Sequence, residues 1–219
     1  MRRDIVTSII AMVVFTILLG IVYPLAITGV SQVAFPGNAN GQQIHVGGKL
    51  VGSKIIGQNF GDPKMKDGKV VEEKGAVVTE PDPRYFQTRP SATEGGADNA
   101  AASTFSNLGP NNRATEEAIA EHIKGYLELE KPYTPGLTAA QVPVDAANSS
   151  GSGLDPEISQ ANADIQAHRI AAVRHLSPST VAALISKYTS GRGLGFSGEQ
   201  GVNVLELNLA LDRLSGEGA

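Results

Sequence analysis

An uncharged apolar run near the N-terminus constrains this chain more than any other feature. From Ile5 to Ile27 the sequence contains no Asp, Glu, Lys or Arg. A helix of that length rises by roughly 34 Å, enough to cross a hydrocarbon core of about 30 Å with some tilt. The run has no polar face, which disfavours a buried helix of a soluble protein. The sequence therefore predicts one transmembrane helix over residues 5–28, after a tail of residues 1–4.

A cleaved signal peptide is the main alternative for this segment. Its apolar core usually runs about 7–15 residues, and no convincing small-x-small cleavage motif follows the longer run found here. Arg2 and Arg3 precede the helix, whereas the next charged residue after it is Lys49. Because basic residues favour the cytoplasmic side, we expect a cytoplasmic N-terminus. The prediction is a single-pass protein of the plasma (inner) membrane, with residues 29–219 forming a periplasmic or otherwise extracytoplasmic domain.

The composition excludes several kinds of chemistry. There are no cysteines, so disulfides, thiolate catalysis and cysteine-bound zinc are ruled out. The net charge is −4 and the basic residues are spread thinly, so no nucleic-acid surface is expected. The phosphate-binding pattern G-x-x-x-x-G-K-[ST] is absent. Any ATP hydrolysis linked to this protein is therefore expected on another chain.

Three stretches of the exported region indicate strands or loops. Residues 49–60, KLVGSKIIGQNF, mix β-branched residues with glycines and predict one or two short strands. Residues 61–84 are charged and irregular, which predicts an exposed loop or hairpin. QVPVDAANSSGSGLDPEIS, residues 141–159, predicts a short strand at its start and then a glycine-serine loop.

Apolar spacing predicts four helices in the same region. The first covers residues 114–129, and Ser159 is suited to cap a second over residues 160–175. Ser177 is suited to cap a third, and residues 202–214 favour a fourth. The stripes expected to face the core are Ile119, Ile123, Tyr126 and Leu127 in the first helix and Val204, Leu207, Leu211 and Leu214 in the last. These elements predict a compact α+β domain behind a single N-terminal transmembrane helix.

A glycine pattern near the C-terminus resembles a nucleotide-binding fingerprint only in its letters. The glycines of G-x-G-x-x-G fall at Gly193, Gly195 and Gly198. A dinucleotide fingerprint follows a strand and opens a helix, whereas this one follows a helix that Gly191 is expected to end. The favoured interpretation is a flexible loop.

Ser152, Asp155 and His168 place a hydroxyl, a carboxylate and an imidazole in one stretch of sequence. The nucleophile pattern G-x-S-x-G is absent, and proximity in sequence does not establish a catalytic triad. His168 and His175 are seven residues apart, too far for the usual i, i+4 metal chelate, so no metal site is predicted. A membrane-anchored exported hydrolase and a solute-binding domain are the alternatives left open.

Eight segments, collinear over nearly the whole chain, carry a resemblance to a known family. They are VYPL at residues 22–25, ANG at 39–41, GSKIIGQNF at 52–60, YFQTRPSAT at 85–93, SNLGPNN at 106–112, PVDAANSSGSGLDPEIS at 143–159, Gln166 with HRIAAVR at 168–174, and VNVLELNLALD at 202–212. Each is weak alone, but eight in order are specific. They resemble KdpC, the C-subunit family of the Kdp potassium-transporting ATPase. Residues 61–84 depart from the family pattern and are interpreted as a surface insertion in the KdpC-like domain.

The resemblance implies a complex that imports K⁺ at the expense of ATP. Its implied partners are a channel-like subunit that binds potassium, a P-type subunit that hydrolyses ATP, and membrane lipid. The C subunit is implied to be non-catalytic, to be needed for assembly, and to raise the ATP affinity of the ATPase subunit as a catalytic chaperone. ATP and K⁺ are then used by the complex, and no catalytic or cofactor-binding residue is assigned to this chain.

We expect the helix to dock on both partners and the acidic exported domain to cap or stabilise the external entrance. The candidates for partner contacts, or for locking loops inside the domain, are the polar members of the matched motifs. They are Arg89, Asn107, Asp145, Ser152, Asp155, Glu206 and Asn208.

Overall fold

A computed structural model describes residues 1–73, 76–93 and 99–215. The chain divides into two compact units, residues 1–43 and residues from 44 onward, and each is described by itself.

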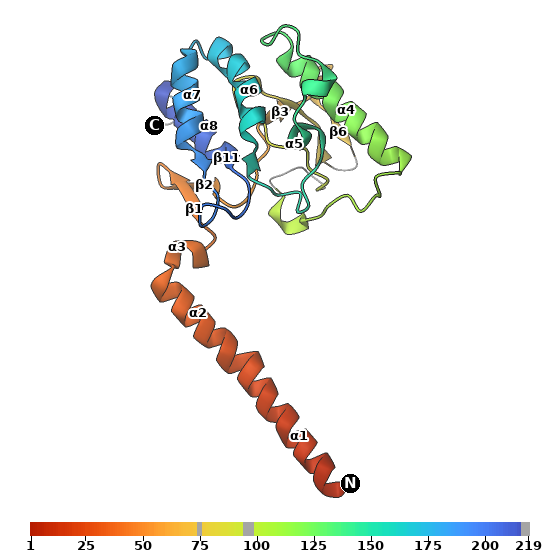
Figure 1. Ribbon diagram of the computed structural model, residues 1–219, viewed down its shortest axis with the longest axis vertical. Coiled ribbons are helices and arrows are strands. Elements are labelled where there is room, and N and C mark those ends of the chain that lie inside the picture. The colour runs from red at the N-terminus through yellow and green to blue at the C-terminus, as the bar shows by residue number, and fades with distance from the viewer. Residues whose placement is uncertain (74–75, 94–98, 216–219) are drawn as a thin grey trace. The chain divides into compact units, whose positions relative to one another are not determined.

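The first unit is dominated by one long apolar helix. It consists of α1 (Arg2–Ile17), a π-helical stretch η1 (Leu18–Val22) and α2 (Tyr23–Ala34), which Figure 1 shows as a continuous rod. The π-helical stretch lies directly before Pro24, whose ring and missing N–H disturb the regular pattern of backbone bonds. The helix Arg2–Ala34 has 33 residues and is long and apolar enough to cross a membrane. It extends beyond both ends of the predicted span, and the short helix α3 (Pro36–Ala39) follows it.

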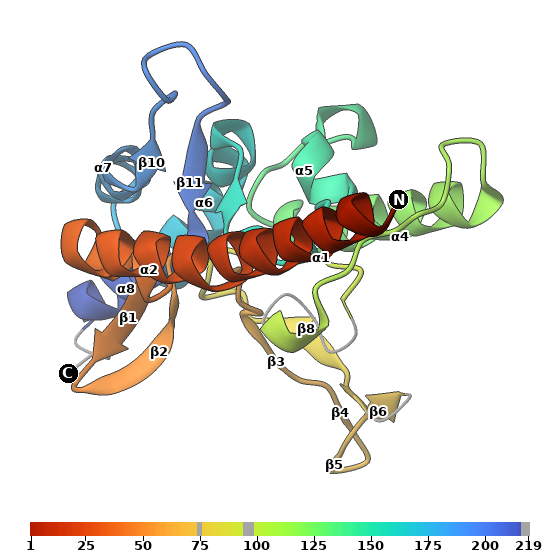
Figure 2. The same ribbon diagram turned by 90° about the horizontal axis from the view of Figure 1, so that it is seen from below.

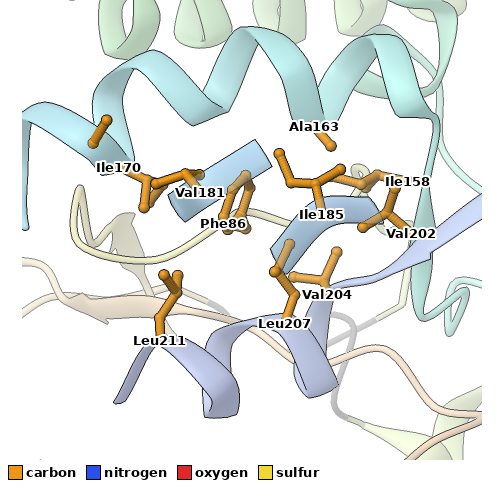
Figure 3. Close-up of a cluster of buried hydrophobic side chains, with 11 residues drawn as sticks. Phe86, Ile158, Ala163, Ile170, Val181, Ile185, Val202, Val204, Leu207 and Leu211 are labelled. Atoms are coloured by element: carbon orange, nitrogen blue, oxygen red, sulfur yellow. The ribbon is translucent and has the colours of Figure 1, made fainter. Parts of the chain in front are cut away.

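The second unit is built around a small antiparallel sheet and three helices. The sheet has the order β10 (Thr189–Ser190), β11 (Gly201–Asn203), β9 (Glu157–Ile158). The helices are α6 (Gln160–Val173), α7 (Pro178–Lys187) and α8 (Val204–Ser215). Figure 3 shows Phe86 among apolar side chains contributed by these helices and by β11. An N-terminal apolar helix followed by a mixed helix-and-sheet domain confirms the predicted fold class.

The helix caps follow the predictions closely. The hydroxyls of Ser159 and Ser177 accept hydrogen bonds from the backbone N–H groups of Asn162 and Thr180. The third helix, however, ends at Lys187 and not at Gly191, because Thr189 already pairs with Val202 in the sheet.

Three predictions about helices and strands need correction. The strand predicted at the start of residues 141–159 is wrong, because 3₁₀ turn η3 (Ala139–Gln141) and helix α5 (Val144–Ala147) occupy this region, with Pro143 as the residue before α5. Helix α4 (Arg113–Glu130) forms as expected, but its apolar stripe is only half-buried, and its fully buried residue is Glu130. In α8, Val204, Leu207 and Leu211 are buried as predicted, whereas Leu214 is exposed.

Residues 61–81 form a branched hairpin that we call the arm. Its stem pairs β3 (Gly61–Pro63) with β8 (Thr79–Pro81), and two smaller hairpins pair β4 (Met65–Lys66) with β5 (Lys69–Val70) and β6 (Glu72–Glu73) with β7 (Ala76–Val77). Backbone bonds close a ring where the three parts meet: Lys64 N–H donates to Val78, Val78 N–H to Val71, and Val71 N–H to Lys64, over 2.8–2.9 Å. Figure 2 shows this part projecting from the rest of the second unit. The predicted hairpin is therefore present, and its status as an insertion stays a prediction.

The remaining elements are short. A hairpin pairs β1 (Gln43–Val46) with β2 (Lys49–Ser53). Only β2 lies within residues 49–60, where strands were predicted. A 3₁₀ turn η2 (Ala100–Ala102) precedes α4.

Candidate functional site

The YFQTRPSAT motif, residues 85–93, runs between helices without forming a strand or a helix of its own. Asn208 of α8 brackets the backbone of Phe86: its Oδ1 accepts the Phe86 N–H at 2.9 Å and its Nδ2 donates to the Phe86 carbonyl at 2.9 Å. The side-chain amide thus makes both bonds that a neighbouring strand would make. It fixes the segment while leaving the Phe86 ring free to enter the core.

Gln166 of α6 does the same for the next residue. Its Oε1 accepts the Gln87 N–H at 2.7 Å, and its Nε2 donates to the Gln87 carbonyl at 3.1 Å. Asn208 and Gln166 are each about 1% exposed. Because a buried amide left without partners is costly, both side chains hold residues 86–87 in one position relative to α6 and α8.

Arg169 forms the centre of a buried polar network beneath this segment. It pairs with Glu130 at 2.9 Å, and both side chains are 0% exposed. It also donates to the carbonyls of Pro83 at 2.6 Å and Tyr85 at 2.9 Å and to Oε1 of Gln166 at 2.9 Å. Burial raises the pKa of the Glu130 carboxyl, against the smaller opposing effect of Arg169. Arg169 therefore ties α4, α6 and the motif segment together.

Arg89, the predicted contact residue of the motif, is engaged inside the domain. Its Nη1 pairs with Oδ2 of Asp155 at 2.8 Å, and its Nη2 donates to the Ser149 carbonyl at 3.4 Å. The two side chains of the ion pair are 24% and 29% exposed, so it lies near the surface. The structure thus brings together two of the predicted residues, which join the motif segment to the loop before α6.

The glycine-serine loop, residues 149–155, receives the far end of the motif segment. Ser91 and Thr93 both donate their hydroxyls to the Gly153 carbonyl, at 2.7 and 3.2 Å. Gly153 has φ +73°, and a Cβ there would meet Oγ1 of Thr93 and lie 2.7 Å from the Thr104 carbonyl oxygen. Only glycine fits this close approach, which explains the second glycine of GSG, Gly153, without catalysis.

Asp145 is also used internally. Its carboxylate accepts the N–H and the hydroxyl of Ser159, both at 2.8 Å, and the Nδ2 of Asn162 at 3.0 Å. A carboxylate at the first turn of α6 stabilises the helix through these bonds and through the helix dipole.

The other predicted residues lie apart from this network. Glu206 pairs with Lys54 at 3.1 Å across partly exposed surface, and Asn107 is exposed on the loop before α4. Ser152 is exposed, and its Oγ accepts the Leu154 N–H at 3.1 Å. Asn107 and Ser152 are the exposed members of the predicted set, whereas Glu206, Arg89 and Asp155 are partly exposed.

The arrangement gives no support to the hydrolase alternative. The nearest partner of the Asp155 carboxylate is Arg89, and His168 Nδ1 lies 2.9 Å from the Thr134 hydroxyl. Within the described ranges, neither group bonds to Ser152, so the serine lacks the general base that a nucleophile requires. No three His, Asp or Glu side chains among the described residues are grouped to hold a metal ion.

A groove of about 500 Å³ runs between α4 and the motif segment. Its walls include Arg89 and Ser91 on one side and His122 and Tyr126 on the other. His122 bonds to the Ala147 carbonyl at 2.9 Å, and the Tyr126 hydroxyl donates to Asn162 at 3.0 Å. Because the His122 ring and the Tyr126 hydroxyl already have partners within the fold, they act as part of the scaffold.

One further charged contact lies where the arm joins the motif segment. Asp82 is buried and accepts bonds from Nε and Nη2 of Arg84, the shortest at 2.7 Å. Burial alone would raise the pKa of Asp82, but the hydrogen bonds and charge of Arg84 outweigh it and hold that pKa below its ordinary value.

Three residues of the network were not among the predicted candidates: Gln166, Arg169 and Glu130. Gln166 and Arg169 are three residues apart in α6 and lie on the same face as the buried Ile170. Two polar residues on an apolar helix face were the sequence signal that could have identified them as buried. No sequence signal marked Glu130 as buried. It is the last residue of a helix that contains several other glutamates, so one more glutamate gives no reason to expect burial.

Comparison with known proteins gives a consistent picture. A family model described as "K+-transporting ATPase, c chain" (KdpC) matches residues 5–213. The potassium-transporting ATPase KdpC subunit of Mycobacterium tuberculosis strain H37Rv is 45% identical over 214 residues, covering 98% of this chain and all of the relative. That of Methylococcus capsulatus is 44% identical over 207 residues (94% and 96%), and that of Koribacter versatilis is 40% identical over 212 residues (97% and 95%).

Proposed function

The chain belongs to the KdpC family of K⁺-transporting ATPase subunits, and we propose that it acts in its complex as a non-catalytic assembly subunit. One observation carries the proposal. The polar motif residues that could have formed a reaction centre are occupied by bonds within the fold: Arg89 with Asp155, Asp145 with Ser159, and Asn208 with Phe86. Such a domain can present a defined surface to partners, and these three pairs leave none of the named motif residues prepared as a nucleophile or base.

The proposed partners are a channel-like subunit that binds K⁺ and a P-type subunit that hydrolyses ATP. The long apolar helix supplies a membrane anchor and a packing surface, and its Gly20 and Gly29 leave open space for a neighbouring helix. With the N-terminus in the cytoplasm, the second unit lies on the opposite, external face of the inner membrane. K⁺ enters the complex from that face. There the acidic domain caps or stabilises the entrance to the pore.

An effect on ATP affinity would then be indirect. The soluble unit and the ATP-binding domain lie on opposite sides of the bilayer in this arrangement, so the helix is the physical connection between them. If the helix packs better against one conformation of the ATPase subunit, it shifts the population toward that conformation. If that conformation binds nucleotide more tightly than the other, the ATP affinity of the ATPase subunit rises.

The test is deletion of this chain in a host that depends on the complex for K⁺ uptake. We expect loss of growth at micromolar K⁺, restored by the wild-type chain and equally by Ser152→Ala. Rescue by the wild type but not by Ser152→Ala would instead support hydrolase chemistry. Growth that is unaffected by the deletion would contradict the proposal.

The indirect effect on ATP has a separate measurement. The purified complex should show a higher KM for ATP when the segment 2–34 is replaced by an unrelated apolar span of equal length. An unchanged KM in a fully assembled complex would show that the helix does not carry the effect.

A further inference from the structure

The loop between β10 and β11, residues 191–200, carries two exposed large apolar side chains at its end. Leu194 is 90% exposed and Phe196 is 76% exposed. Figure 2 shows the loop extending away from α6 and α7. Exposed side chains at the end of a projecting loop add no buried apolar area to their own domain. Their exposure is therefore the feature to explain, and a contact with another molecule would explain it.

The end of the loop is held in one conformation. Gly193 and Ser197 exchange backbone hydrogen bonds of 2.7 and 2.8 Å, and the Phe196 N–H donates to the Gly193 carbonyl at 3.2 Å. Leu194 has φ +53°, a region that a residue with a Cβ seldom adopts. Such backbone strain is concentrated at functional sites, and here the strained residue is the more exposed of the two apolar residues.

The base of the loop is fixed as firmly as its end. Ser190 pairs with Gly201 in the sheet, and its hydroxyl donates to Glu157 at 2.9 Å. Halfway along, Arg192 and Glu199 form an ion pair of 2.9 Å across the loop. The backbone that carries the two apolar side chains is therefore bonded at the base of the loop and at its end.

We propose that Leu194 and Phe196 form a preorganised knob that inserts into an apolar pocket on the exported surface of another protein subunit of the complex. The inference rests on the proposed function, and it names the part of this chain that makes the contact. A shaped pocket benefits from a fixed knob, because little conformational freedom is lost on binding. A lipid surface is fluid and needs no fixed shape, and the apolar helix already supplies the anchor. The ion pair beside the knob suits the polar rim of a protein interface.

Photo-crosslinking in intact membranes tests the proposal directly. Benzoylphenylalanine in place of Phe196, in the full chain expressed with the whole complex, is expected to give an adduct with another protein subunit. The matched control carries the same group in place of Met65, an exposed apolar residue on a different hairpin. Adducts with lipid alone, or no adduct beyond the Met65 control, would overturn the proposal.

A pair of double variants gives an independent readout. Leu194→Ser/Phe196→Ser should weaken association with the complex about tenfold or more in detergent. Met65→Ser/Val70→Ser should leave it unchanged, and both should keep the wild-type unfolding midpoint and membrane fraction. Equal association of the knob variant and the wild type would overturn this inference but leave the subunit role intact. A wild-type chain that captures no transport subunit would instead contradict the proposed function, and the inference with it.

Discussion

The arm and the motif segment that follows it are stabilised in opposite ways. The described residues of the arm, 61–73 and 76–81, are short β-hairpins that backbone bonds join to one another. The motif segment, residues 85–93, has no regular structure, yet Phe86 is fully buried and side chains from α6 and α8 hold its backbone. Regular pairing is therefore a poor measure of how firmly a segment is fixed in this domain.

The arm and the motif segment differ in whether water can reach the hydrogen-bonding groups that lose a partner when a contact is removed. Loss of a contact in the arm exposes backbone groups that water can satisfy. Loss of a side chain under the motif segment leaves buried donors or acceptors without partners, which costs more than the bond itself contributes. The following changes test this contrast, from the largest expected effect to the smallest.

Arg169→Met should be the most destabilising change. It leaves the Glu130 carboxylate buried without its charged partner and removes the donor to the carbonyls of Pro83 and Tyr85. We expect a loss of about 3–5 kcal/mol in the free energy of unfolding, measured by urea titration of the full chain in detergent. Arg113→Met, in an exposed ion pair with Glu117, is the control and should leave the midpoint unchanged. Adding Glu130→Gln to Arg169→Met should recover part of the loss, and an undiminished loss would argue against the buried-charge explanation.

Asn208→Asp probes the bracket around Phe86 with almost no change in shape. The carboxylate still accepts the Phe86 N–H, but an oxygen now faces the Phe86 carbonyl where Nδ2 donated. The expected loss is about 1–3 kcal/mol. Asn107→Asp, on the exposed loop before α4, makes the same chemical change and should have no measurable effect. Equal midpoints for the two variants would mean that the bracket does not fix the segment.

These two changes also mark what the sequence could and could not predict. Caps, helices and the apolar face of α8 follow from local patterns, so Ser159, Ser177 and Leu207 were identified in advance. The bonds between Asn208 and Phe86 could not be predicted in the same way, because the two residues are 122 apart in the sequence. A sequence motif does not show which backbone groups a side-chain amide will bind.

The predicted set of contact residues shows the same limit. Arg89 and Asp155 were both named, but their pairing depends on the fold of a loop that has no periodic pattern. The misassigned strand before α5 has a related cause: a four-residue helix is too short for periodicity to reveal.

Asp82 lies between the two regions and should give a pH-dependent effect. Its pKa is lowered in the folded state, so its charged form stabilises the fold. That contribution is fully present above the ordinary carboxyl pKa of about 4 and is lost as the pH falls through the lower folded value. The stability difference between wild type and Asp82→Asn should therefore be constant near neutral pH and shrink in acid. Urea midpoints taken from neutral to acidic pH measure this, and a gap that widens in acid would refute the assignment.

Shortening the arm should have the smallest effect. Replacing residues 65–77 by Asn-Gly joins Lys64 to Val78, whose N–H and carbonyl are already bonded at 2.8 Å, through a two-residue turn suited to a hairpin. The change removes Val71 from the backbone ring and, among the described residues, no buried side-chain bond, and it keeps the exposed Lys64–Glu80 ion pair. The free energy of unfolding should change by less than about 0.5 kcal/mol, and growth at micromolar K⁺ should persist. A loss of unfolding free energy as large as that expected for Asn208→Asp would show that the arm and the motif segment do not differ in this way.

The Asn208 bracket also sets the order in which this protein can mature. A ribosome makes Phe86 long before it makes Asn208, and until then the Phe86 backbone lacks the partner that secures it. The domain is thus expected to remain loosely organised until α8, which carries Asn208, has been made. A transcript cut short anywhere before α8 would yield a product that stays unfinished and open to proteolysis.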